Sequence, residues 1–377
     1  MSTIPFTNFF AVFGFPGLFL TVLLNGALVR YRASFVLRDR NDNQKPEDAS
    51  RVQVQAYAAG PSVNGVFHML VRVGKLEGWA GFLKGLVPTC LLSMLLFNLF
   101  LHIFSALLYL PTHTVQELYF LQAYFPPATL LTFFLVSIPS SIIVNRAICT
   151  PYRLHFFRPK QALRVLLSEE ERKRPWKLWG LGLVSAHAVH GVVKVTTLVI
   201  LPEIVRKMLK DPNPFISRAI VFFMRSVVGS NFEEGEVDGL LTEMEGNLRI
   251  ILEAFIWFGL AVIASLLLAP LEVMMVRLTT QKLELQGDLD MNGPSVKAFE
   301  RTATEAEQAV ALGLQTYSDE AVVQLRCDTD LKASPYTSLY DCFIRMRQEE
   351  KDGWKVFYRG YWITLLVCLI CDPYRIA

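Results

Sequence analysis

Residues 77–85 read Glu77-Gly78-Trp79-Ala80-Gly81-Phe82-Leu83-Lys84-Gly85, and residues 352–360 read Asp352-Gly353-Trp354-Lys355-Val356-Phe357-Tyr358-Arg359-Gly360. Both stretches follow the pattern acid-Gly-Trp-x-x-Phe-x-base-Gly, which specifies six of nine positions. Each copy comes after an amphipathic stretch, 66–73 or 341–348, and opens an apolar run. Agreement at this many specified positions indicates an internal repeat, whose copies are expected to share one local structure.

The middle third of the chain matches this pattern only in part, at Ala162–Leu167 and then at Pro175–Gly180. A second recurring stretch is clearest at 270–277, where Pro270 is followed by Glu272 and Arg277, with Gln281 shortly after. Its counterparts are 139–146, from Pro139 to Arg146, and 25–32, which contains Arg30 and Arg32. A proline bends a helix, so kinks at Pro139 and Pro270 are expected to turn the charged side chains that follow toward a common interior.

The composition favours a membrane protein. Hydrophobic residues make up 52% of the 377 positions, charged residues only 19%, and mean hydropathy is +0.35; soluble domains carry about 25% charged residues. The formal net charge of +3 is too small and too dispersed to predict nucleic-acid binding. We therefore expect a lipid bilayer as a partner and no nucleic acid.

Six apolar stretches lie at about 6–29, 86–110, 119–145, 179–201, 248–270 and 361–371. Most have the roughly 20 residues that a helix needs to cross a bilayer, so the predicted fold is an all-α membrane protein with six transmembrane helices. The segment 146–177 carries nine basic and three acidic residues, whereas 203–245 carries five basic and eight acidic ones. By the positive-inside rule, 146–177 is then expected on the side of the membrane that carries the basic loops, which we call the positive side.

Catalytic and metal-binding motifs are not evident. The only closely spaced cysteines, Cys368 and Cys371, lie inside an apolar run without histidine partners, which favours buried thiols over a redox or metal site. The sequence has no nucleotide-binding glycine loop, zinc-protease motif or nucleophile elbow. We expect no enzyme activity, no cofactor and no metal.

With its repeated acid-Gly…base-Gly stretches and its Pro270–Gln281 stretch, the chain resembles the mitochondrial carrier family, as an atypical, fungal-like member with degenerate gate motifs. The resemblance implies one domain over 1–377, built from three parallel pseudo-repeats at 1–115, 116–245 and 246–377. The polar stretches 39–62 and 283–334 are then predicted to be disordered insertions outside the bundle. The repeat glycines would be Gly78, Gly85, Gly353 and Gly360.

In that family an acid of each repeat pairs with a base of the next and closes the positive-side end. In this sequence one such pair matches the family, Glu272 with Arg30. The second base of the family motif is present in each repeat, as Arg32, Arg146 and Arg277. An intramembrane ion pair is a functional-site candidate by default. The alternative is that both side chains extend to the membrane surface.

The family's substrate positions fall on Leu92, Ser93, His187, Ala188, Val367 and Cys368 in this sequence. Only His187 among them can carry a positive charge. His190 and Lys194 follow at helical spacing, so the three would share one helix face. This face could bind an anion or could stabilise helix contacts.

Two functions follow as hypotheses. The first is transport of a small solute across a mitochondrial membrane by an atypical carrier. The second is a carrier-fold adaptor or scaffold of the outer membrane that no longer transports and acts through protein partners in fusion, morphology or lipid handling. The lost gate charges favour the second, and the remaining Glu272 with the kink prolines favours the first. The choice between inner and outer membrane stays open.

Overall fold

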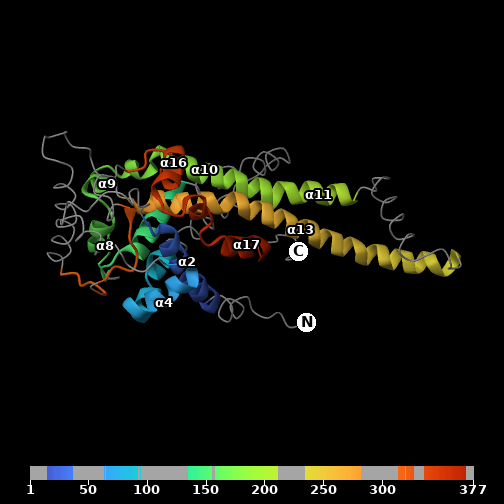
Figure 1. Ribbon diagram of the computed structural model, residues 1–377, viewed down its shortest axis with the longest axis horizontal. Coiled ribbons are helices and arrows are strands. Elements are labelled where there is room, and N and C mark those ends of the chain that lie inside the picture. The colour runs from blue at the N-terminus through green and yellow to red at the C-terminus, as the bar shows by residue number, and fades with distance from the viewer. Residues whose placement is uncertain are drawn as a thin grey trace, which may run out of the picture. The chain divides into compact units, whose positions relative to one another are not determined.

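Helices form nearly all the regular structure of the chain (Figure 1), and the computed structural model describes residues 15–36, 63, 65–91, 94, 135–154, 158–210, 234–281, 313–318, 320–326 and 335–370. In these ranges the only β-type pairing is an isolated antiparallel bridge between Tyr152 and Thr316. The predicted helical class is therefore confirmed. The number of membrane spans is not established by the described residues.

The helices divide among the three predicted repeats, and the first long helix assigned to the third repeat begins at Glu234, before the predicted boundary at 246. The first repeat has α2 (Phe15–Ala33), α4 (Val66–Leu76), α5 (Gly78–Phe82) and a helical segment at 86–91. The second has the helix Leu135–Cys149, α8 (Pro159–Leu166), α9 (Glu169–Lys173), the 3₁₀ helix Pro175–Trp179, α10 (Leu181–Val195), the π-helix Thr196–Ile200 and α11 (Leu201–Lys210). The third has α13 (Glu234–Thr280), α16 (Leu339–Glu349), the 3₁₀ helix Gly353–Tyr358 and α17 (Tyr361–Ile370).

Local sequence signals explain where the amphipathic helices begin. Ser168 and Glu171 form a reciprocal capping box at the start of α9, which satisfies two backbone N–H groups that the helix cannot bond itself. Ser338 accepts a hydrogen bond from the Asp341 N–H at the start of α16. A proline occupies the first turn of α8, where its missing N–H costs nothing.

The chain divides into two compact units, and each has its own core. The first unit comprises 1–187 and 272–360, and the second comprises 188–271 and 361–377. In the first unit the completely buried apolar side chains include Met69, Val73, Ile138, Val273, Met346 and Val356. In the second unit the core consists of Leu198, Ala261, Ala264, Leu268 and Cys368.

Two helical stretches among the described residues are long and apolar enough to cross a membrane. They are Leu181–Val205, with a mean hydropathy of 1.6, and Ala254–Thr280, with a mean hydropathy of 2.3. Both overlap apolar runs that the sequence predicts as spans, and the shorter apolar helix Leu135–Cys149 overlaps a third. These lengths and compositions are compatible with an all-α membrane protein. Pro270 lies inside the continuous helix α13.

Part of the predicted insertion 283–334 packs within the first unit. Leu314, Val322 and Val323 are buried, and the backbone around them bonds to residues of other repeats. The expectation that the whole stretch lies outside the bundle therefore does not hold for 313–326, because these three apolar side chains have a surface to pack on. Residues 283–312 and 327–334, like the predicted insertion 39–62, lie outside the described residues.

Candidate functional site

One buried arginine–glutamate pair occurs in each repeat, at the end of its first helix. Arg30 bonds Glu77 at 2.8 Å, Arg146 bonds Glu171 at 2.6 Å, and Arg277 bonds Glu350 at 2.6 Å. All six side chains are at most 5% exposed. A buried charge is tolerated only when a partner neutralises it and hydrogen bonds satisfy it, so these pairs fix each helix to the surface segment that follows it.

A second pair joins the acid and the base of each acid-Gly…base-Gly stretch. Glu77 contacts Lys84, and Asp352 bonds Arg359 at 3.2 Å. The middle repeat has the same seven-residue pair, Glu170 with Lys177 at 2.8 Å. The motif is only partly present in the middle third, but Glu170 and Lys177 make the same acid–base contact there as the motif residues make in the other two repeats.

Cations of each repeat also cap the first helix of the next repeat. Lys84 donates to the Thr150 carbonyl at 2.8 Å, just after the helix Leu135–Cys149. Arg146 donates to the carbonyls of Thr279 at 2.9 Å and Gln281 at 2.5 Å, at the end of α13. Arg277 and Arg359 both donate to the Ser34 carbonyl, just after α2.

These caps have a physical reason and a cyclic order. The last carbonyls of a helix lack partners within it, and the helix dipole favours positive charge there. The first repeat caps the second, the second caps the third, and the third caps the first. Together with the buried pairs, they form what we call the ion-pair ring, which consists of Arg30, Glu77, Lys84, Arg146, Glu171, Arg277, Glu350 and Arg359.

Close glycine contacts run in the same cyclic order. Gly85 has φ +85°, and a Cβ placed on it would lie 2.7 Å from the Ile148 side chain of the second repeat. Gly360 has φ +75°, and its Cβ would overlap the Leu28 side chain of the first repeat. The predicted repeat glycines Gly78 and Gly353 also have positive φ, +64° and +52°. Glycine adopts this backbone conformation without steric cost.

The predicted pair Glu272–Arg30 is wrong. Glu272 instead bonds Arg32 at 2.6 Å, which joins the third repeat to the first. Arg30 is held by Glu77 and by the Gly81 carbonyl at 2.9 Å. The packing of α2 against α4 and α5 brings Glu77 to Arg30, and the sequence pattern did not show this competing acid.

Of the remaining predicted signature residues, Gln281 holds a backbone segment and Pro139 lies inside a helix. The Gln281 amide pairs reciprocally with the Tyr336 backbone, donating to its carbonyl at 3.0 Å and accepting from its N–H at 2.8 Å. Pro139 lies within the helix Leu135–Cys149, in which Asn145 donates to Thr279 at 2.8 Å.

The predicted substrate residues are only partly described. His187, His190 and Lys194 all lie on α10, as their spacing predicts. The His187 ring lies 3.4 Å from the Ser141 hydroxyl and 3.0 Å from the Leu183 carbonyl, whereas Lys194 is exposed. Val367 on α17 is 48% exposed. Leu92 and Ser93 lie outside the described residues.

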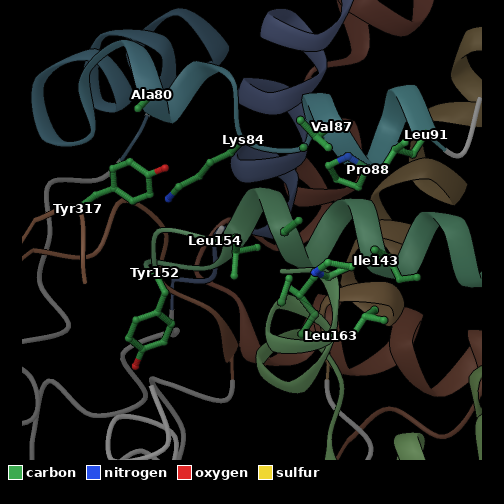
Figure 2. A pocket seen from close by; sticks show the side chains of 15 residues that line it. Ala80, Lys84, Val87, Pro88, Leu91, Ile143, Tyr152, Leu154, Leu163 and Tyr317 are labelled. Carbon is green, nitrogen blue, oxygen red and sulfur yellow. The ribbon is translucent and has the colours of Figure 1, made fainter. Parts of the chain in front are cut away.

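An apolar pocket of about 220 Å³ lies beside the ion-pair ring (Figure 2). Its lining includes Val87, Pro88, Ile143 and Leu163, and Lys84 extends along it toward the Tyr317 ring (Figure 2). The Lys84 ammonium lies 4.1 Å from the centre of that ring. Burial lowers the pKa of Lys84 from 10.5 to about 8, against the opposing effect of Glu77.

This lowered pKa predicts how stability depends on pH. Between about pH 8 and pH 10.5 the unfolded chain keeps the Lys84 proton while the folded chain loses it, so the free energy of unfolding gains a positive contribution as pH rises. Thermal unfolding in detergent across this range should show that contribution as the difference between wild type and Lys84→Met. Identical pH profiles for the two proteins would contradict the assignment.

No metal site is found in the described ranges, since no group of three or more His, Cys, Asp or Glu side chains there could hold an ion. Cys368 is buried, and Cys371 lies outside these ranges. The sequence pattern did not single out Glu171 or Glu350. For Glu171 the capping signal Ser168-x-x-Glu171 was available; for Glu350 we find no sequence signal.

Comparison with protein-family models, with curated proteins and with solved structures finds no match to this chain. The resemblance to the mitochondrial carrier family therefore remains a prediction from the sequence.

Proposed function

We propose that the chain is an atypical carrier of the mitochondrial carrier fold, with six membrane spans in three repeats, that moves a small solute across a mitochondrial membrane. The observation that carries this proposal is the Arg32–Glu272 pair. It links the first and third repeats, and its Glu272 side chain is 24% exposed, whereas the acids of the three buried Arg–Glu pairs are at most 4% exposed. Of these four pairs, Arg32–Glu272 is thus the one whose separation should cost the least free energy.

The threefold repetition supports the proposal as well. A carrier needs repeats that close on one another at one end, and the cyclic caps give such a closure in the first unit. The substrate class is a small, weakly polar or anionic solute, since His187 beside Ser141 is the one side chain at the predicted substrate positions that can carry a positive charge.

Reversing the charges of the Arg32–Glu272 pair by mutation tests the proposal. In liposomes loaded with a broad mixture of metabolites, Glu272→Arg should lower solute exchange about tenfold or more, because it places two like charges together. The double variant Arg32→Glu with Glu272→Arg should recover part of the exchange. Arg30→Lys is the matched control on the same helix and should keep exchange, because a cation still faces Glu77.

Two results would contradict transport. One is the absence of exchange for every metabolite by folded wild-type protein. The other is exchange that persists in protein-free liposomes; equal exchange by Glu272→Arg and wild type would instead contradict only the role of the Arg32–Glu272 pair.

A non-transporting adaptor or scaffold is the second candidate function. The observation that favours it is the extent of cross-repeat bonding, since the Ser34, Thr150 and Thr279 carbonyls are each held by a cation of another repeat. A scaffold would rescue mitochondrial morphology in cells without any solute exchange, and Arg32–Glu272 variants would leave that rescue unchanged.

A further inference from the structure

The segment 313–326, which we call the strap and which is described except at 319, lies against the ends of the first helices of two repeats. The Phe35 N–H donates to the Gln324 carbonyl at 2.9 Å, just beyond α2. Just beyond the helix Leu135–Cys149, Arg153 N–H donates to Gln315 at 2.8 Å and Tyr317 N–H donates to Pro151 at 3.2 Å. The strap comes from the third repeat, so its backbone joins all three.

Side chains fasten the strap to the same repeats. Arg72 of α4 bonds Glu320 at 2.5 Å and the Ala321 carbonyl at 3.1 Å. Arg326 bonds Glu349 of α16 through two nitrogens, at 2.7 and 2.9 Å. The Tyr317 ring lies over Lys84, a member of the ion-pair ring (Figure 2).

The contacts of the strap are more exposed to water than those of the ion-pair ring, so they are expected to stabilise less. Glu320 is 55% exposed, and an ion pair that water reaches contributes little to stability. Only three apolar side chains of the strap, Leu314, Val322 and Val323, are buried. A segment with few buried apolar contacts opens locally more easily than the core around it.

The second repeat has no segment of comparable length to the strap. The interval from Pro139 to Gly180 is 41 residues, whereas the interval from Pro270 to Gly360 is 90. The extra length in the third repeat contains the strap. A basic three-repeat architecture does not need this segment, because the second repeat has its own buried pair and cap without one.

We propose that the strap is a detachable lock, which holds the ends of the first helices of the first two repeats together and must release before this end of the bundle can open. The inference rests on the proposed transport function. The lock is the chain's own segment 313–326, and its release would break the contacts with Phe35, Arg153 and Lys84 together.

The isolated bridge offers a way to fix the strap in place. Tyr152 and Thr316 face each other in antiparallel geometry, and the flanking bonds, Arg153 to Gln315 and Tyr317 to Pro151, make them a non-hydrogen-bonded pair. Such pairs have Cα atoms about 4.5 Å apart, which a disulfide can span. Tyr152→Cys together with Thr316→Cys should therefore lock the strap on oxidation and release it on reduction.

Cys149 is the reporter for opening. It is half-buried and precedes Thr150, whose carbonyl accepts the Lys84 bond. The experiment uses the full chain in liposomes, with the other five native cysteines replaced by serine, and measures the rate at which a membrane-impermeant maleimide labels Cys149. Peptide mapping confirms that positions 152 and 316 are joined in the oxidised protein.

Three comparisons of labelling rate decide the outcome. The oxidised lock should label more slowly than its own reduced form. Releasing the strap by Tyr317→Ala with Glu320→Ala should raise the rate about tenfold or more over wild type, as local opening becomes more populated. The control Gln315→Ala, an exposed strap position that keeps its backbone bond, should label at the wild-type rate.

Equal labelling rates for the oxidised lock, the reduced lock and the release variant would overturn the lock. This readout needs no substrate, so the failure of the lock and the failure of transport are distinguishable. A protein that exchanges solutes but shows no effect of the strap on labelling retains the proposed function and loses the lock.

Discussion

Glu350→Ala is expected to lower the free energy of unfolding by about 3–5 kcal/mol, the usual cost of removing one partner of a buried ion pair. Glu350 is fully buried and bonds Arg277 at 2.6 Å and Arg359 at 3.1 Å. Its loss would leave two guanidinium groups, themselves at most 6% exposed, without their shared carboxylate. Denaturant unfolding in detergent measures the change.

Asp352→Ala is the matched control for Glu350→Ala. Asp352 also bonds Arg359, at 3.2 Å, but its side chain is 50% exposed. Exposed pairs contribute about 0–1 kcal/mol, so the control should lose no more than that. If the two variants lose equal stability, the buried carboxylate does not have the role that we assign to it.

Gly360→Ala is expected to cost about 2–5 kcal/mol, from two sources that add. An alanine at φ +75° adopts a left-handed conformation, which costs about 1–2 kcal/mol. Its Cβ would also overlap the Leu28 side chain, and overpacking of this kind costs about 1–3 kcal/mol. Unfolding in detergent again gives the value.

Gly353→Ala separates the two costs. Gly353 has φ +52°, but a Cβ there meets no atom within 4 Å, so only the backbone cost applies. Adding Leu28→Ala to Gly360→Ala should recover part of the loss, because the side chain in the way is removed. Equal losses at Gly353 and Gly360 would show that the first and third repeats do not meet closely there.

The repeat pattern predicted one local structure for residues 77–85 and 352–360, and the two copies agree at their glycines, although Gly78–Phe82 is α-helical and Gly353–Tyr358 is a 3₁₀ helix. From the motif alone, the glycines at the two ends of each stretch were expected to be equivalent, and Gly78, Gly85, Gly353 and Gly360 all have positive φ. This succeeds because a turn is determined by residues that are neighbours in the sequence. The seven-residue acid–base pairs are local in the same sense.

Pairings between distant residues were harder to predict. The partner of Arg30 could not be read from its own helix, because Glu77 reaches it only when α4 and α5 pack on α2. In the third repeat the buried acid is Glu350, two positions before the motif acid Asp352. A sequence pattern cannot show such a shift, because burial and not spacing selects the carboxylate that neutralises Arg277.

The strap shows the limit of composition as a guide. The stretch 283–334 is polar on average, which predicts disorder, yet Leu314, Val322 and Val323 are buried. An average over many residues hides a few apolar side chains. Only the structure shows that the ends of other helices supply the backbone partners of this segment.

Sided labelling at position 141 tests the transport proposal most directly, because it needs no known substrate. Ser141 lies beside His187 in the middle repeat, where a solute would pass. In cysteine-free protein carrying Ser141→Cys, a membrane-impermeant maleimide should label this position from either side of oriented vesicles, because a carrier opens to each side in turn. Labelling from one side only, or from neither side, would contradict transport and favour the scaffold.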